Sequence, residues 1–352
     1  MQQTFLKHEY FKNINLQDPF FDSLKDNYEG FERWFLKKRD EKAYFHENEE
    51  GIQAFLYLKV EDEELINIYP PQPRKKRIKI GTLKINPHGT KLGERFLKKA
   101  IDHAVVGDIK ELYVTIFPKH TELITLLEKY GFRVEAKKTT SDGVENVMVK
   151  RLDEATGDLL ADYPLVNLHR KNIHLLGILP KYHTLLFPDS ILTNESFDLI
   201  KDTSHTNSIH KVYICYMKDA KYIKSGDIIV IYRTNDYQGP AEYRSVATSI
   251  CVVESQKSKQ DFKDYDEYYE FCKKHSVFSD EELNSLYKRD DMIAIKMTYN
   301  LAMERKLIRK TLIEDCGVPR EGYWGIKRLT EDKFENIVKL GGIHESFIID
   351  QA

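Results

Sequence analysis

The sequence predicts a mixed α/β protein of the α+β type, in which a mixed sheet with flanking helices is followed by a second, strand-rich domain. In the first half, apolar residues recur at helical spacing between Leu92 and Val105, with short β-branched and aromatic runs on both sides. In the second half, buried runs of strand character alternate with glycine and proline turns. A chain of 352 residues is long enough for two separate cores.

The expected elements of the first half follow from capping and periodicity. Asp18 followed by Pro19 indicates a helix start, and the helical run continues through Phe35. The predicted strands are 4–10, 43–46, 52–60, 77–87 and 112–117, with a closing hairpin of 133–140 and 145–152. Helices are predicted over 92–105 and over a segment that ends at Tyr130. These elements predict a first domain over 1–152, a linker over 153–160 and a second domain over 161–352.

Composition excludes several classes of protein. The net charge is −2, and residues 1–150 contain 26 Lys and Arg against 24 Asp and Glu, so neither half has the basic excess of a protein held to nucleic acid by charge alone. No apolar run is long enough for a membrane span, and the N-terminus lacks an apolar signal core. Four widely spaced cysteines predict reduced thiols rather than disulfides or a metal site. We therefore expect a cytoplasmic protein without a membrane partner or a bound metal.

A glycine-containing turn at a helix start is the strongest functional signal. Gly89 and Gly93 flank the beginning of the helix at 92–105, where backbone amides and the helix dipole suit a bound pyrophosphate. Together with the Gly131-Phe132 pair, this stretch resembles the acyl-CoA-binding part of the GNAT (Gcn5-related) N-acetyltransferases. In that family a Gln/Arg-x-x-Gly-x-Gly/Ala turn holds the cofactor. Here His88 and Lys91 replace two of the usual residues of that turn.

The resemblance implies acetyl-CoA as cofactor and a specific set of contacts. The residues expected to bind it are Leu83, Ile85, His88, Gly89, Thr90, Lys91, Leu92, Gly93, Glu94 and His120. Lys91 is either a solvent-facing residue of the first turn or a partner for a CoA phosphate. His120 stands where many relatives carry an asparagine that orients the cofactor arm, and its other interpretation is a surface histidine.

The second half carries strands at 210–216, 228–234 and 243–254, and a late strand followed by a helix. The run Gly226–Thr234 resembles the PUA-like proteins, especially the ASCH and EVE branches, over about 205–345. This likeness implies a small closed β-barrel with helices and an association with RNA or modified bases. Tyr232, Arg233 and Trp324 are the candidates for holding a base by stacking. The other interpretation places each of them in the core or rim of the barrel.

Two functional hypotheses follow from these resemblances. The first is an acetyl-CoA-dependent N-acetyltransferase in which an amide near Leu83 or Ile85 polarises the thioester carbonyl, while the second domain selects an RNA or RNA-associated substrate. The second is a catalytically silent scaffold with a nucleic-acid-binding or ligand-binding module. Leu127 occupies the position of the tyrosine that often protonates the departing thiolate in GNAT enzymes, which favours the second hypothesis. The acceptor, the general acid and base, and the oligomeric state are not indicated.

Overall fold

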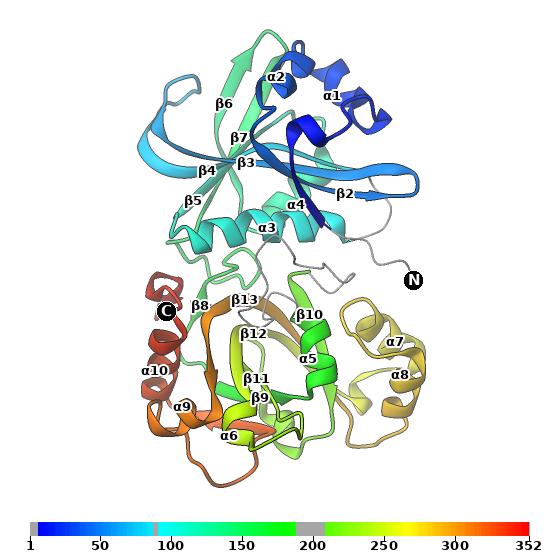
Figure 1. The fold of residues 1–352 in the computed structure, drawn as a ribbon, viewed down its shortest axis with the longest axis vertical. Coiled ribbons are helices and arrows are strands. Elements are labelled where there is room, and N and C mark those ends of the chain that lie inside the picture. Colours follow the sequence, from blue (N-terminus) through cyan, green and yellow to red (C-terminus); the bar gives the residue numbers. More distant parts are fainter. Residues whose placement is uncertain (1–5, 87–90, 188–207, 352) are drawn as a thin grey trace. The chain divides into compact units, whose positions relative to one another are not determined.

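The structure is a computed structural model that describes residues 6–86, 91–187 and 208–351. The chain divides into two compact units, Met1–Asp162 and Tyr163–Ala352, each with its own sheet (Figure 1). His88, Gly89 and Thr90, which are predicted to bind the cofactor, lie outside the described residues. Among the described residues, no helix is both long and apolar enough to cross a membrane.

The described part of the first unit contains a seven-stranded sheet with the order β1-β2-β3-β4-β5-β7-β6. Its strands are β1 (Leu6–Tyr10), β2 (Lys42–Asn48), β3 (Gly51–Leu65), β4 (Gln72–Ile85), β5 (Glu111–Ile116), β6 (Arg133–Thr140) and β7 (Gly143–Arg151). Its helices are α1 (Asp22–Asn27), α2 (Phe31–Lys37), α3 (Leu92–Val106) and α4 (Thr121–Lys129). The strands predicted from the sequence are present, with shifted ends.

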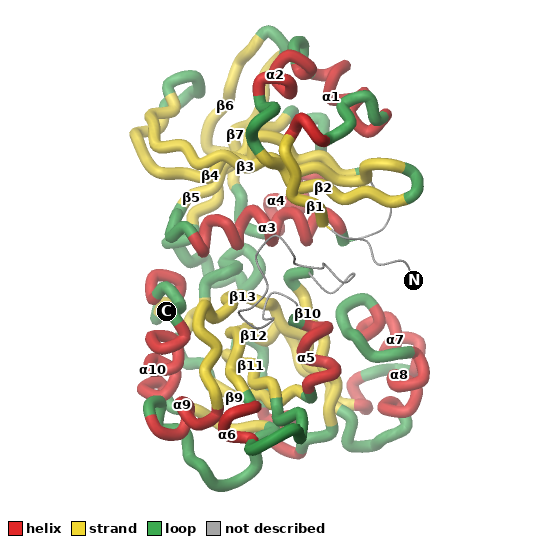
Figure 2. The backbone as a smooth tube through the Cα atoms, in the orientation of Figure 1, coloured by secondary structure: helices red, strands yellow, loops and turns green. Residues whose placement is uncertain are grey.

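Helices cover both faces of this sheet (Figure 2). Helix α3 buries the apolar stripe that its 3.6-residue periodicity predicts, including Phe96 and Ile101. Helices α1 and α2 cover the other face through an aromatic cluster that includes Phe11, Phe35 and Phe55. Successive residues of a strand point to opposite faces of the sheet. Phe55 therefore packs in the aromatic cluster under α1 and α2, while its neighbours in β3 face α3.

The helix expected after Asp18 is interrupted. Asp18 does cap a helical turn, because its side chain accepts a hydrogen bond from the Phe20 N–H. The chain then forms α1 and stops at Tyr28, which is extended, and Gly30 has a φ of 86° before α2 begins. Glycine adopts this left-handed conformation without steric cost, so the break is set locally. The result is two short helices joined by an irregular turn.

Strands β4 and β5 run parallel and then separate. Ile78 pairs with Leu112 and Ile80 with Val114, and within the described strands no pairing continues beyond that point, although β4 extends to Ile85. At the same level the pairing of β4 with β3 shifts by one residue, which leaves Gly81 as an extra residue. A bulge of this kind bends a strand and increases its twist. The bulge therefore turns the end of β4 away from β5 and opens a gap in the sheet.

The described part of the second unit contains a six-stranded sheet with the order β10-β13-β12-β11-β9-β14 and a short pair, β15-β8. The strands are β8 (Val166–Asn167), β9 (Ile173–Ile178), β10 (His210–Cys215), β11 (Ile228–Arg233), β12 (Val246–Ser258), β13 (Ile293–Ile308), β14 (Ile326–Leu329) and β15 (Ile348–Ile349). The helices are α5 (Pro180–Leu186), α6 (Ala241–Arg244), α7 (Tyr265–Lys273), α8 (Asp280–Tyr287), α9 (Arg309–Glu314) and α10 (Glu331–Gly341).

The expected closed barrel is not seen in the described residues. Closure would require the edge strands β10 and β14 to pair with each other. Instead β10 pairs with β13, and the short strand β14 pairs with β9, so the sheet among the described residues is open. Bulges between β12 and β13 still curve it. The predicted strands at 210–216, 228–234 and 243–254 are present with shifted ends, whereas β9 was not predicted as a strand and the closed barrel is wrong for this part of the chain.

Candidate functional site

A cleft of about 570 Å³ passes through the gap between β4 and β5 in the first unit. On one side it is lined by His120 and Leu123, at the beginning of α4. On the other side it reaches Tyr28 and Trp34, near the junction of α1 and α2. The end of β4, from Ile80 to Ile85, forms one wall, and β5 forms the opposite wall. The separation of the two strands is therefore what creates the cleft.

Two backbone amides of β4 are directed into the gap. The Asn86 N–H donates to the Gln53 carbonyl in β3, at 2.8 Å. Backbone groups alternate in direction along a strand, so the Ile85 N–H points away from β3, and the Leu83 N–H does the same. Both amides thus face the side that β5 has left. These are the two amides that the sequence predicts for polarising a thioester carbonyl.

The first turn of α3 lies beside this end of β4. A Cβ atom on Gly93 would be 2.8 Å from Leu126 Cδ2 in α4 and 3.6 Å from Ile85 Cδ1. The absence of a side chain at Gly93 therefore permits close packing of α3 against α4. This packing role is separate from the predicted role of Gly93 in binding a ligand. Leu92 is buried in the core. The Glu94 carboxylate accepts hydrogen bonds from Lys129 and Tyr130 at 2.8 and 2.9 Å, which ties α3 to the end of α4.

Two further residues predicted to bind the cofactor occupy these helix starts. Lys91 is the N-cap residue of α3 and is partly buried. His120 is the N-cap residue of α4 and lines the cleft. Burial and then the charge of Lys119 lower the pKa of His120 below its usual value. At neutral pH its imidazole is therefore neutral and able to accept a proton.

A charged cluster lies on the α1–α2 side of the cleft. The buried Glu61 carboxylate accepts a short hydrogen bond from Tyr113 and a 2.9 Å hydrogen bond from Lys59, and Lys79 Nζ is 3.7 Å away. Burial acts to raise the pKa of Glu61, but the hydrogen bonds from Tyr113 and Lys59 outweigh it and lower the pKa. Glu61 is thus an anion shared by two ammonium groups.

Tyr28 and Glu145 meet at the end of the cleft. The Tyr28 hydroxyl donates to Glu145 Oε1 at 3.1 Å, and the ring packs against Phe117 with centroids 5.2 Å apart. Burial and then the negative charge of Glu145 raise the pKa of Tyr28 well above its usual value. The tyrosine is therefore a permanent hydrogen-bond donor at physiological pH.

Sequence reasoning did not single out Tyr28, Glu61, Lys79 or Glu145. A local signal existed for Tyr28, because Asn27 through Gly30 is a turn-prone stretch inside the expected helix. For the other three the sequence carries no comparable signal, since a charged residue in a strand is ordinarily taken as solvent-facing. Within the described ranges, no cluster of three or more His, Cys, Asp or Glu side chains could hold a metal ion.

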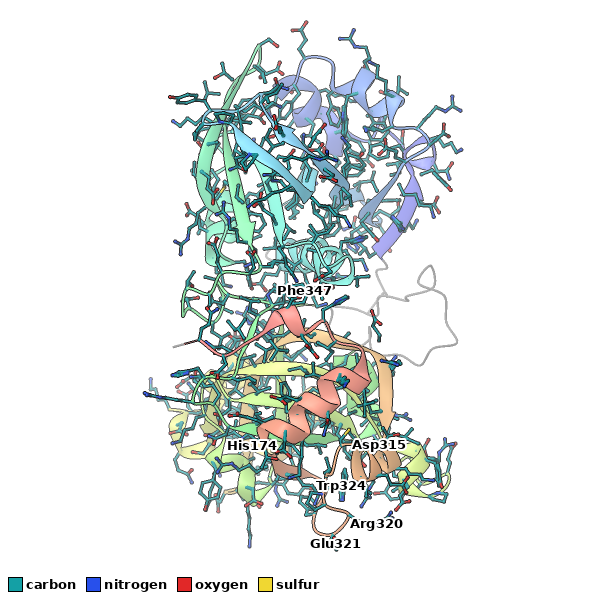
Figure 3. All side chains as sticks on the ribbon, turned by 90° about the vertical axis from the view of Figure 1, so that its left-hand side faces the viewer. His174, Asp315, Arg320, Glu321, Trp324 and Phe347 are labelled. Carbon is teal, nitrogen blue, oxygen red and sulfur yellow. The ribbon has the colours of Figure 1, made fainter. Side chains whose placement is uncertain are left out.

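In the second unit, Tyr232 and Trp324 lie together, with ring centroids 5.3 Å apart. Tyr232 is 1% exposed and Trp324 is 8% exposed. Trp324 lies on the loop that carries Arg320 (Figure 3), to whose carbonyl its indole N–H donates at 3.0 Å. The Arg309 guanidinium covers the Trp324 ring at 4.2 Å. As they stand, the two rings are packed against the protein's own groups.

Arg233 does not join this stack. It follows Tyr232 in β11, so its side chain points to the other face of the sheet. Its guanidinium is 3.6 Å from Asp236, and among the described residues its Nε atom is buried without a hydrogen-bond partner. Arg309 thus occupies the stacking position that the sequence assigns to Arg233. Base binding by Tyr232, Arg233 and Trp324 stays a prediction.

Neither a protein-family model nor a curated protein sequence matches this chain. Solved structures similar to it include both ASCH-domain and GNAT proteins. The ASCH protein from Zymomonas mobilis is 10% identical, covers 48% of this chain and 94% of its own, and has a TM-score of 0.34. A GNAT-family acetyltransferase from Streptococcus agalactiae is 14% identical, covers 40% of this chain and 76% of its own, and has a TM-score of 0.27.

A third structure is Arabidopsis thaliana Naa50 in complex with the bisubstrate analogue CoA-Ac-MVNAL. It is 16% identical, covers 31% of this chain and 71% of its own, and has a TM-score of 0.25. At such identities and scores, none of the three places this chain in a family. The function is therefore argued below from the chain's own residues.

Proposed function

We propose that the first unit transfers an acyl group from acetyl-CoA to an amine. The observation that carries this proposal is the gap between β4 and β5, into which the Leu83 and Ile85 amides are directed. A sheet that opens at a bulge offers unpaired backbone donors in a partly buried cleft. Acyl transfer needs such a donor, because negative charge develops on the carbonyl oxygen of the thioester.

The cofactor is proposed to enter from the side of α3 and α4. The N-terminus of α3, with Gly93 in its first turn, offers backbone N–H groups and a favourable dipole for the pyrophosphate of acetyl-CoA. The thioester arm then passes between the strands toward Leu83. His88, Gly89, Thr90 and Lys91 stay part of this proposal. For Leu92 the contact is restricted to the backbone, because its side chain is buried.

The chemical step is a direct attack. The amine nitrogen forms a bond with the carbonyl carbon, the carbon–sulfur bond breaks, and the CoA thiolate leaves. The amine must lose a proton, and His120 is the proposed acceptor because it is neutral and lines the cleft. Leu127 is fully buried and has no hydroxyl, so it cannot protonate the thiolate. The proton for the thiolate comes from solvent or from His120, which has taken it from the amine.

The direct test is calorimetry, in which acetyl-CoA is titrated into the wild-type protein and into a variant whose cleft is filled. Thr115 in β5 lines the cleft, and Thr115→Trp would fill the gap with an indole ring. Thr139→Trp is the matched control, since Thr139 is exposed in β6 and does not line the cleft. We expect wild type and Thr139→Trp to bind acetyl-CoA and Thr115→Trp to lose binding. The absence of binding to the wild-type protein would refute the proposal.

A second function, nucleic-acid binding by the second unit, is favoured by its exposed aromatic rings. Tyr216, Tyr237 and Tyr323 are 54%, 87% and 66% exposed, and an Arg289 guanidinium lies 4.0 Å from the Tyr216 ring centroid. Exposed rings and arginine planes can stack on unpaired bases. Fluorescence anisotropy with short RNA and DNA oligonucleotides tests this function, and failure to bind either at tens of micromolar protein would exclude it.

A further inference from the structure

A segment that we call the strap, Tyr28-Glu29-Gly30, crosses the cleft. It joins α1 and α2, which lie in the chain between β1 and β2 at one edge of the sheet. Its contacts are with the hairpin of β6 and β7 at the other edge: the Glu29 N–H donates to Asp142 Oδ1 at 3.1 Å, and the Tyr28 hydroxyl donates to Glu145. The strap therefore passes over β4 and β5, where the gap opens.

The strap is held by hydrogen bonds to two carboxylates, of which the one from Tyr28 is partly buried and the one from the Glu29 N–H is exposed. Glu145 is 4% exposed and also faces Lys138 at 3.7 Å. Hydrogen bonds to a buried carboxylate are stronger than those between neutral groups. Next to the strap, Lys119 donates to the Asn27 side chain at 2.5 Å, so a third link joins the α1 end to the start of α4. These contacts hold the strap across the cleft.

A second connection bounds the same face of the sheet. The long hairpin of β3 and β4 curls over so that Tyr69 pairs with Lys137 in β6, with N–H···O distances of 2.8 and 2.9 Å. Near it, the Gln72 amide donates to Glu135 at 3.2 Å. The face that holds the cleft is thus spanned by two connections, the strap and this hairpin.

The space between these connections is limited. The cleft of about 570 Å³ includes the part that the acyl group and its arm would occupy. Pockets of this size hold small molecules, and they bury most of the ligand surface. A folded protein could present a lysine only by displacing the strap, and this would break the partly buried Tyr28–Glu145 hydrogen bond. The geometry therefore favours an acceptor of metabolite size.

The charge in the cleft indicates one further property of the acceptor. Lys79 lies in β4 at the point of separation and lines the cleft. Its carboxylate neighbour is Glu61 at 3.7 Å, which is already bound more closely by Lys59 and Tyr113. Burial lowers the pKa of Lys79, the charges of Lys138 and Lys59 lower it further, and Glu61 offsets these effects only in part. One carboxylate is thus shared by the ammonium groups of Lys59 and Lys79, and the more distant one, Lys79, suits an anion in the cleft.

Resting on the acyl transfer proposed above, we infer that the acceptor is a free, metabolite-sized amine that carries an anionic group. It lies under the strap, with its amine toward the Leu83 and Ile85 amides and its anionic group on Lys79. A carboxylate and a phosphate would both satisfy Lys79, and the acceptors in the assay distinguish them.

The first experiment measures CoA release from acetyl-CoA by the full chain with matched acceptors. Each of tyrosine, phenylalanine and lysine is compared with the amine left by removal of its α-carboxylate, and phosphoethanolamine is compared with ethanolamine, so the two members of each pair differ in one anionic group. A ten-residue peptide and folded lysozyme represent larger acceptors. We expect at least one carboxylated or phosphorylated amine to exceed the partner that lacks its anionic group about ten-fold or more in kcat/KM, as a lost charge-assisted contact predicts. The peptide and lysozyme should be poor acceptors.

Substitutions then test whether Lys79 binds the anionic group and whether the strap limits the size of the acceptor. Lys79→Gln should raise KM about ten-fold for the amine with the anionic group and leave KM nearly unchanged for the partner that lacks this group. Lys76→Gln is the matched control, because Lys76 is exposed in the same strand and does not line the cleft. Tyr28→Phe combined with Asp142→Ala removes both strap contacts and should raise the rate with the peptide relative to the small amine. Melting temperatures of all variants show that they are folded.

The outcomes separate this inference from the proposed function. If acetyl-CoA binds and the wild-type chain acetylates lysozyme or the peptide as fast as every small amine, the inference is wrong and acyl transfer stands. If anionic amines show no advantage, or if Lys79→Gln and Lys76→Gln behave alike, the assignment of Lys79 is wrong. If acetyl-CoA does not bind at all, the proposed function fails before the acceptor is considered.

Discussion

At the residue scale, the cleft brings together groups whose ordinary properties are changed by burial. The pKa of His120 is lowered because desolvation disfavours the charged imidazole. Tyr28 keeps its proton more firmly, since burial and the Glu145 carboxylate both disfavour the phenolate. One residue is thus available as a base and the other as a donor. Perturbed titration of several groups in one cleft is a recognised sign of a functional site.

The proposed role of His120 as the general base predicts a pH profile. The folded-state pKa lies below the usual value of about 6.5, so the neutral form is present at pH 7 and is lost as pH falls through that lower pKa. We expect kcat in the wild type to fall on the acid side of pH 6.5, as the imidazole becomes protonated. His120→Asn should lower kcat about a hundred-fold, the usual size for a lost general base, with acetyl-CoA affinity retained. Weaker binding with unchanged kcat would show instead that His120 orients the cofactor.

The direction of the β4 amides predicts an asymmetry between neighbouring proline substitutions. The Leu83 N–H faces the gap, so Leu83→Pro removes no ladder bond to β3, whereas Lys84→Pro removes one. Leu83→Pro should fold, bind acetyl-CoA and lose about a hundred-fold in kcat, as the loss of one oxyanion donor does. Lys84→Pro should lower the melting temperature. Full activity in a folded Leu83→Pro protein would move the oxyanion donor to Ile85, which Ile85→Pro then tests.

At the element scale, the site depends on how irregular positions join regular elements. The bulge at Gly81 separates β4 from β5, and the break at Gly30 divides a helix into two and forms the strap. A Cβ atom at Gly81 would be 2.7 Å from Tyr57 Cδ1, so even alanine would displace that ring. Both glycines act through local geometry, and the cleft follows from that geometry.

Gly93 has two separable roles at the junction of α3 and α4. Gly93→Val should destabilise the protein by about 1–3 kcal/mol through overpacking against Leu126. Adding Leu126→Ala makes room and should recover most of the lost melting temperature, which a double-mutant cycle measures. If the pyrophosphate also needs Gly93, acetyl-CoA binding stays lost in the stable double variant. Recovered binding would limit Gly93 to a packing role.

At the scale of the whole molecule, the chain consists of two units, each with its own sheet and core. Residues 163–352 contain 27 Lys and Arg against 28 Asp and Glu, so counterion release can contribute little to any nucleic-acid binding by this part. Contacts with exposed rings would then supply the affinity. A shallow salt dependence is the expected signature.

The second unit offers a test that separates packing from binding. Trp324 packs between Tyr232 and Arg309, so Trp324→Ala should lower the melting temperature, as removal of a buried aromatic side chain does. Tyr237→Ala should leave stability unchanged, because that ring is 87% exposed. If oligonucleotides bind, loss of affinity in Tyr237→Ala would place the stacking surface on exposed rings. Loss in Trp324→Ala without loss of stability would restore the prediction for Trp324.

The sequence alone determined the order of elements in the first unit and the helix stripe of α3, because capping and periodicity are local properties. It also indicated the amides of Leu83 and Ile85, through a resemblance. The tertiary structure decided what lies around them. Tyr28 and Glu145 are 117 positions apart along the chain and meet because the strap crosses the sheet. The open second sheet was likewise not predictable, because strand pairing depends on contacts between residues far apart in the chain.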